Sequence, residues 1–143
     1  MTIRVLVVDD NAFVRMSVVS VLRQVDGFVV VGECADGAEV AVATELVRPD
    51  VVLTDLQMPV MSGIDVAWIL RTTQPAVRVL ILSGLMTTRM LAAAASAGAV
   101  GFVHKDGDAS SLVRAVRAVA AGGTAWPTGF TPGEAALVDS ARR

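Results

Sequence analysis

The chain has 143 residues, 54% of them hydrophobic, which is enough for one domain with a sizeable core. Its formal net charge of −2 at pH 7 excludes a broad nucleic-acid-binding surface. Its single cysteine, Cys34, excludes an internal disulfide and fits a cytoplasmic location. No apolar run has the length of a transmembrane helix, and we find no secretion signal.

Apolar runs alternate with segments of helical periodicity along the chain. We predict strands at Ile3–Val8, Phe28–Glu33, Val51–Thr54, Val77–Leu82 and Ala99–Val103, and helices at Ala12–Val25, Ala38–Val47, Gly63–Arg71, Thr88–Ala97 and Ala109–Ala121. The strands are rich in Val, Ile and Leu without alternation, which is typical of parallel strands buried on both faces. Five successive βα units therefore predict an α/β fold, a doubly wound parallel sheet with flanking helices.

Residues 123–143 depart from this pattern. Their first half is rich in Gly, Thr and Pro, which predicts a linker. Thr131, Pro132 and Glu134 then have the spacing of a capping box, which predicts a short helix. We therefore predict a main domain at 1–122, followed by a linker and a short C-terminal helix.

Three acidic residues stand at the ends of predicted strands. Asp9 and Asp10 follow the first strand, and Asp55 follows the third. Open parallel sheets bind ligands at the carboxyl ends of their strands, so the three carboxylates share one pocket if these strands are neighbours. Like charges so close raise each other's pKa, and a hard cation such as Mg²⁺ relieves the repulsion. The sequence therefore predicts a Mg²⁺ site with one carboxylate available for chemistry.

Two more polar residues stand at the same predicted rim. Ser83 follows the fourth strand and Lys105 the fifth. Taken singly, each residue also has a structural reading, because Asp9 or Ser83 could cap a helix and Lys105 could be a solvated surface lysine. All five together at these spacings favour a shared site.

These motifs resemble the CheY-like receiver domain of two-component response regulators. The resemblance covers roughly residues 3–121. The motifs that carry it are Val7-Val8-Asp9-Asp10, Asp36-Gly37, Asp55 with Met58-Pro59 and Gly63, Leu82-Ser83-Gly84, and Gly101-Phe102-Val103-His104-Lys105. It implies a five-stranded sheet in the order 2-1-3-4-5.

The resemblance also implies a role for each site residue in a phosphorelay. Asp55 is the implied phospho-acceptor, and the implied Mg²⁺ ligands are Asp9, Asp10, Asp55 and the backbone carbonyl of Gln57. Lys105 would hold a phosphoryl oxygen, Ser83 would move to meet the phosphoryl group, and the ring of Phe102 would follow Ser83. The implied donor is a sensor histidine kinase, a homodimer is a possible state, and no catalysis is implied beyond the domain's own phosphorylation and dephosphorylation.

Three further segments narrow the branch of the family. Lys105-Asp106, Val30–Gly37 and Val119–Gly123 resemble the NarL/LuxR-type transcription regulators, in which a helix-turn-helix domain follows the receiver. Residues 130–138 resemble the beginning of that domain, but no recognition helix follows, so this chain is expected not to bind DNA. Either a truncated or decayed two-domain regulator or a stand-alone receiver acting by protein–protein interaction fits this pattern.

Three other functions fit the residues less well. Phosphatases and phosphotransferases with an acyl-phosphate intermediate carry a second acid two residues after the nucleophile on the first strand, where this chain has Asn11 after Asp9. A flavodoxin-like cofactor carrier needs a Ser/Thr/Gly-rich phosphate loop there, and two carboxylates would repel phosphate. An interaction domain with a silent pocket keeps the fold, but nothing in the sequence favours it.

Overall fold

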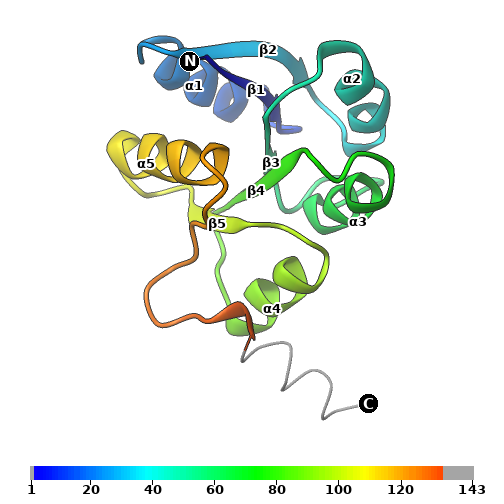
Figure 1. Ribbon diagram of the computed structural model, residues 1–143, viewed down its shortest axis with the longest axis vertical. Helices are drawn as coiled ribbons and strands as arrows, with labels where there is room; N and C mark the ends of the chain where they lie inside the picture. The colour runs from blue at the N-terminus through cyan, green and yellow to red at the C-terminus, as the bar shows by residue number, and fades with distance from the viewer. Residues whose placement is uncertain (1, 134–143) are drawn as a thin grey trace.

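Five parallel strands form the centre of the computed structural model, which describes residues 2–133 (Figure 1). The strands are β1 (Ile3–Val8), β2 (Phe28–Cys34), β3 (Val51–Asp55), β4 (Arg78–Ser83) and β5 (Gly101–His104). The helices are α1 (Ala12–Arg23), α2 (Val40–Val47), α3 (Gly63–Thr73), α4 (Thr88–Ser96) and α5 (Ala109–Ala120), with a 3₁₀ turn, η1 (Gly37–Glu39), before α2. None of these helices is long and apolar enough to cross a membrane.

The sheet has the strand order β2-β1-β3-β4-β5, as predicted. The chain places β2 on one side of β1 and β3 on the other, with Val5 beside Val51 and Val8 beside Thr54. The strand order reverses between β1 and β3, and ligands of open α/β sheets bind at the carboxyl side of such a point. The residues that follow β1 and those that end β3 therefore lie side by side.

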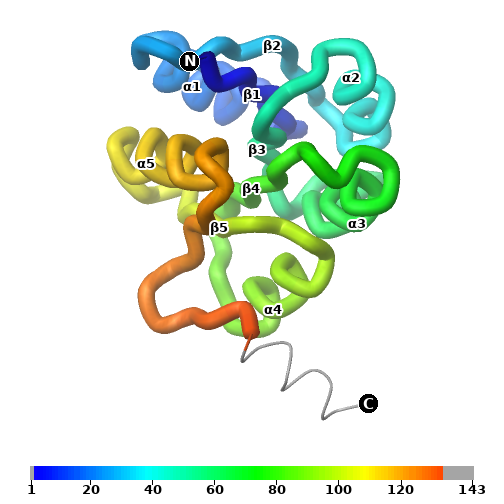
Figure 2. The backbone as a smooth tube through the Cα atoms, viewed as in Figure 1, coloured from blue at the N-terminus to red at the C-terminus, as the bar shows by residue number. Residues whose placement is uncertain are grey.

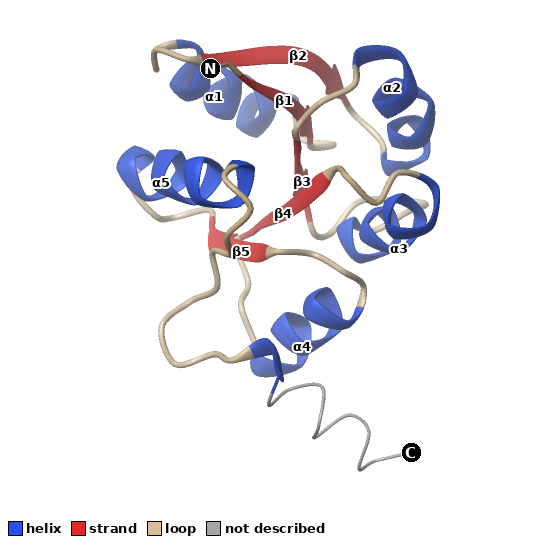
Figure 3. Cartoon of the chain, in the orientation of Figure 1, coloured by secondary structure: helices blue, strands red, loops and turns tan. Residues whose placement is uncertain are grey.

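Alternate side chains of each strand enter two separate cores. Val5 and Val7 of β1 pack in the core under α1 and α5, whereas Leu6 and Val8 pack in the core under α2, α3 and α4. This alternation follows from the two-residue period of a strand. The helices accordingly cover both faces of the sheet, with α1 and α5 on one of them (Figure 3).

The observed boundaries differ from the predicted ones by a few residues. Helix α1 ends at Arg23, two residues earlier than predicted, and the turn into β2 passes through Gly27 with a φ of 89°. The second helix is delayed by η1, where the Asp36 carboxylate accepts the backbone N–H of Ala38. Strands β3 and β4 each run one residue further than predicted, so Asp55 and Ser83 are themselves the last residues of their strands.

The linker returns to the sheet after α5. Ala125 forms a parallel bridge with Gly101 of β5, and Trp126 packs against the core beneath α4. The segment lies beside β5 and reaches α4 (Figure 2). Pro132 and Gly133 are helical, but the rest of the predicted C-terminal helix, residues 134–143, lies outside the described residues. The predicted division at residue 122 stays a prediction.

Candidate functional site

The three acidic residues predicted to share a pocket do meet in the structure. Carboxylate oxygens of Asp9, Asp10 and Asp55 lie within 4.8 Å of one another. Asp9 and Asp55 are buried, and Asp10 is exposed. The cluster forms because β1 and β3 are neighbours with their carboxyl ends at the same rim.

The turn after β1 is held by hydrogen bonds on both sides of Asp9. Its backbone N–H donates to the carbonyl of Cys34 at 3.0 Å, and its carboxylate accepts the N–H of Asn11 at 2.9 Å. The cap of α1 is Asn11, whose side chain accepts the N–H groups of Phe13 and Val14. Asp9 therefore does not serve as the helix cap, and its carboxylate faces the cluster.

Lys105 links the two buried carboxylates. Its Nζ lies 3.2 Å from Oδ2 of Asp9 and 3.1 Å from Oδ1 of Asp55. Its backbone N–H donates to the carbonyl of Ser83 at 2.8 Å, which fixes the residue beside the end of β4. The side chain is 23% exposed, so Lys105 is a pocket residue and not a solvated surface lysine.

The electrostatics of the cluster favour a cation. Burial raises the pKa of Asp55 above its ordinary value; the hydrogen bond from Lys105 opposes this shift, and the charge of Asp9 adds to it. Burial alone would lower the pKa of Lys105, but its hydrogen bonds to Asp55 and Asp9 outweigh burial, so this pKa is raised. One ammonium thus faces three carboxylates, and the charge of the cluster is not balanced within itself.

This donor set fits a hard divalent cation. Three convergent carboxylates supply oxygen ligands, and the exposed side of the cluster at Asp10 leaves room for the waters that Mg²⁺ keeps. Gln57, the fourth predicted ligand, lies in the exposed loop two residues after Asp55. Its carbonyl role stays a prediction.

Gly63 brings that loop close to the site. Its backbone N–H donates to the carbonyl of Leu56 at 2.8 Å, and a Cβ built at Gly63 would lie 2.3 Å from the carbonyl oxygen of Asp55. Glycine is therefore required where α3 begins against the end of β3. In the same loop, Val60 has a φ of 55°, a region that β-branched residues rarely adopt.

Ser83 is the last residue of β4, the strand beside β3, and Phe102 lies on β5. Ser83 is buried, and its hydroxyl oxygen accepts the N–H of Leu85 at 3.1 Å. The cap of α4 is Thr87, so the capping role considered for Ser83 does not hold. Phe102 is 2% exposed and belongs to the core beneath α4. Their predicted switching roles stay predictions.

Sequence reasoning missed one residue at the site, Arg15. Its Nη1 donates to the carbonyl oxygen of Asp9 at 2.6 Å, and its Nε lies 3.4 Å from a carboxylate oxygen of Glu33. The arginine therefore ties α1 to the ends of β1 and β2. Arg15 lies four residues after the cap Asn11, one turn into α1, which is the only hint in the sequence that it lies near the end of β1. The direction of a long side chain cannot be predicted from that spacing.

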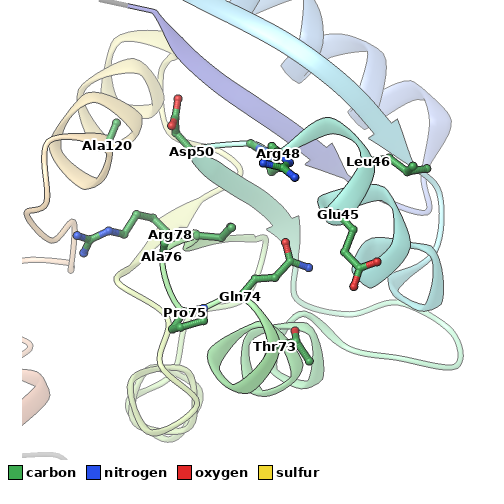
Figure 4. Close-up of a pocket in the computed structure, with 12 residues that line it drawn as sticks. Glu45, Leu46, Arg48, Asp50, Thr73, Gln74, Pro75, Ala76, Arg78 and Ala120 are labelled. Atoms are coloured by element: carbon green, nitrogen blue, oxygen red, sulfur yellow. The ribbon is translucent and has the colours of Figure 1, made fainter.

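A wide groove of about 990 Å³ lies at the other end of the sheet, beside the amino ends of β3 and β4. Its polar residues include Arg48, Asp50, Gln74 and Arg78, and in Figure 4 these side chains point apart. The groove does not hold the carboxylate cluster, so the chemistry of the rim is separate from it.

Comparison with known proteins identifies this arrangement. Residues 5–117 match the response regulator receiver domain family. The chain belongs to this family.

Its relatives point to the predicted branch. The chain is 31% identical over 129 residues to the transcriptional regulatory protein LnrK of Bacillus subtilis (strain 168), across 90% of this chain and 59% of that protein. The signal receiver domain of the putative response regulator NarL from Mycobacterium tuberculosis superposes with a TM-score of 0.82 at 36% identity, covering 85% of this chain and 98% of that one. A LuxR-family two-component response regulator from Aurantimonas sp. SI85-9A1 gives a TM-score of 0.84 at 32% identity, covering 99% of both chains.

These matches confirm the predicted receiver fold and its NarL/LuxR-type branch. The chain spans 56–60% of the length of LnrK and of two further curated relatives, so it corresponds to part of those proteins.

Proposed function

We propose that this receiver accepts a phosphoryl group on Asp55 in a Mg²⁺-dependent reaction, with a phosphohistidine of a sensor histidine kinase as the donor. The observation that carries the proposal is the convergence of three carboxylates and the Lys105 ammonium at the reversal point of the sheet. Asp9, Asp10, Asp55 and the carbonyl of Gln57 are the proposed metal ligands.

The residues divide the chemistry between them. A carboxylate oxygen of Asp55 attacks phosphorus, an O–P bond forms, the N–P bond of the donor breaks, and its electron pair returns to the imidazole. Mg²⁺ bound by the carboxylates supplies charge neutralisation for the transferring phosphoryl group. Lys105, which lies 3.1 Å from Asp55, exchanges its carboxylate contact for a phosphoryl oxygen.

We propose that Ser83 and Phe102 transmit this event. The Ser83 hydroxyl gives up the N–H of Leu85 and bonds to the phosphoryl group, and the ring of Phe102 follows. Such an electrostatic change at one site biases a loop and a helix surface between two arrangements. The domain has no other catalytic role than its own phosphorylation and dephosphorylation.

The output is proposed to be transcriptional regulation, because the related LnrK is a transcriptional regulatory protein. The receiver would act through another part of the same polypeptide or through a partner protein, such as a second copy of the chain. Leu112 and Val116 of α5 are buried in the core, so these two side chains do not supply a dimer face.

Isothermal titration calorimetry with beryllofluoride, a mimic of the phosphoryl group, tests the proposal. We expect the wild-type chain to bind it when Mg²⁺ is present and not in EDTA, and Asp55→Asn to lose binding. Asp36→Asn is the matched control, because Asp36 stands at the same rim but caps η1, a role that Asn also fills. Binding that persists in Asp55→Asn would contradict the proposal.

A further inference from the structure

The side chain of Arg15 is directed at the backbone of the turn between β1 and α1. Its Nη1 donates to the carbonyl oxygen of Asp9 at 2.6 Å, and its Nε lies 3.4 Å from a carboxylate oxygen of Glu33. The Cα–Cβ bonds of a helix tilt toward its amino end, so a side chain one turn into α1 is able to reach back to the end of β1. The Arg15 side chain is 18% exposed, so most of it is withdrawn from solvent to make these contacts.

The first turn of α1 gives Arg15 a fixed base. The side chain of Asn11 caps the helix by accepting the N–H groups of Phe13 and Val14. The backbone N–H of Arg15 donates to the carbonyl of Asn11 at 3.0 Å. One turn further on, Val18 is buried in the core under α1 and α5. The guanidinium therefore extends from a part of the helix that is itself held in place.

The carbonyl that accepts this bond belongs to the peptide unit between Asp9 and Asp10. A peptide unit is planar, so a hydrogen bond to its oxygen fixes the direction in which the chain enters Asp10. Asp10 is the exposed member of the carboxylate cluster, so core packing does not hold its side chain. The placement of the Asp10 carboxylate therefore depends on the backbone that Arg15 holds.

Arg15 has two opposite effects on a cation in the cluster. Its positive charge near the carboxylates repels Mg²⁺, so loss of this charge alone would tighten Mg²⁺ binding. Its contact with the turn keeps the Asp10 carboxylate within 4.8 Å of those of Asp9 and Asp55, so loss of this contact would weaken binding. Mg²⁺ is sensitive to such a displacement because it demands a nearly ideal octahedron of ligands. The sign of the change in affinity thus distinguishes the two effects.

We propose that Arg15 is a positioning residue for the metal site, which holds Asp10 in place for Mg²⁺ through the carbonyl of Asp9. The inference rests on the proposed function, in which the three carboxylates bind Mg²⁺. Glu33 lies beside the guanidinium and offsets its charge, so the repulsion is small and the positioning effect is the larger one. Groups that hold metal ligands in place commonly contribute tenfold or more to metal affinity.

Calorimetric titration with Mg²⁺ alone tests the inference. Arg15→Met keeps the apolar length of the side chain and removes its donors, so its dissociation constant for Mg²⁺ should be about tenfold higher than that of the wild-type chain. Arg15→Lys keeps the charge and a donor, so its dissociation constant should lie between the two. It also serves as the milder variant if Arg15→Met does not fold, which urea unfolding establishes. Tighter or unchanged binding in the variants that fold would overturn the inference.

Two control variants exclude other causes. Glu33→Gln removes the partly exposed partner of Arg15 and leaves the carbonyl contact, so its Mg²⁺ affinity should stay within about twofold of wild type. Val116→Ala opens a cavity in the fully buried part of α5 and lowers stability away from the turn, so its Mg²⁺ affinity should not change. If Val116→Ala weakened Mg²⁺ binding as much as Arg15→Met, general loss of stability would be the cause and the inference would fail.

The outcomes separate the two proposals. Wild-type binding of Mg²⁺ that is lost in Asp10→Asn but unchanged in Arg15→Met and Arg15→Lys would overturn the positioning role and leave the proposed metal site standing. Failure of the wild-type chain to bind Mg²⁺ would overturn the proposed function, and the positioning role with it.

Discussion

Lys105 shows at the scale of a single residue how one cation serves two purposes. In the described structure it bonds to Asp9 and Asp55, and in the proposed reaction it bonds to a phosphoryl oxygen. We predict that Lys105→Met binds Mg²⁺ more tightly than the wild-type chain, because a competing cation is gone. The same variant should bind beryllofluoride about tenfold more weakly, as expected for one lost charge-assisted hydrogen bond. Calorimetry measures both, and an unchanged beryllofluoride affinity would refute the role of Lys105.

Asp55 gives a prediction about pH. Its pKa is raised in the folded chain, chiefly by burial, so the folded state keeps the proton to a higher pH than the unfolded state. The stability that this proton contributes is fully present at pH values below the ordinary pKa of an aspartate. It is lost as the pH rises through the raised pKa of Asp55 in the folded chain. We therefore predict that metal-free Asp55→Asn is more stable than the wild-type chain at pH 7, by about 1 kcal/mol.

Urea unfolding over a pH series measures this difference. The advantage of Asp55→Asn should shrink as the pH falls through the raised pKa, because the wild-type carboxyl is then neutral as well. An advantage that is constant over the whole series would mean that ionisation of Asp55 is not its cause.

The contact of Arg15 with the Asp9 carbonyl was not predicted from the sequence. Arg15→Ala removes the bond to the Asp9 carbonyl, which is part-buried, and should lower the free energy of unfolding by about 1–2 kcal/mol. Glu33→Gln removes the partly exposed ion pair with Arg15 and should cost less than about 1 kcal/mol. Chemical denaturation compares the two, and equal losses would show that the ion pair, and not the carbonyl contact, is what matters.

The acids of the site were predictable because each occupies a strand end, and a parallel sheet brings such ends together. The order of the strands is enough to predict that Asp9, Asp10 and Asp55 meet. The contact of Arg15 with Asp9 depends on the direction of a flexible side chain, which the spacing of residues in the sequence does not give. The position of the Gln57 carbonyl depends on a loop conformation, which spacing does not encode either.

At the scale of elements, the junction of β3 and α3 sets the position of Asp55. A methyl group at Gly63 would meet the Asp55 carbonyl oxygen at 2.3 Å, so Gly63→Ala must displace α3 or the strand end. We predict a loss of more than about 2 kcal/mol in the free energy of unfolding, together with weaker beryllofluoride binding.

Gly84→Ala is the matched control for that prediction. A Cβ at Gly84 has no atom within 4 Å, so its stability should stay within about 0.5 kcal/mol of wild type. Similar losses in the two variants, measured by chemical denaturation, would show that the close approach at Gly63 is not the cause.

The elements themselves were predictable, and their ends less so. Runs such as Val51–Leu53 are apolar without a break, and the segments between such runs have a helical period. Residues 124–130 were predicted as a linker, because their Gly, Thr and Pro content gives no strand signal. Their pairing with β5 comes from the sheet edge that they meet and from the missing side chain at Gly101.

At the scale of the whole molecule, the two cores hold the carboxylates together against their own repulsion. Metal binding to the folded state alone should therefore stabilise the entire chain. We predict that Mg²⁺ at a hundred times its dissociation constant adds about 2.7 kcal/mol to the free energy of unfolding. Asp10→Asn should lose most of this gain, because Asp10 belongs to the cluster and is exposed. Thermal denaturation with and without Mg²⁺ measures the gain, and an equal gain in the variant would place the metal elsewhere.

The central claim is that Asp55 accepts a phosphoryl group with the help of Mg²⁺, and intact-mass spectrometry tests it most directly. The chain is incubated with acetyl phosphate in the presence of Mg²⁺ or of EDTA, with Asp55→Asn in parallel. We predict a mass increase of one phosphoryl group in the wild-type chain with Mg²⁺, no increase in EDTA and none in Asp55→Asn. An adduct that survives in Asp55→Asn, or the absence of any adduct in the wild-type chain with Mg²⁺, would contradict the claim.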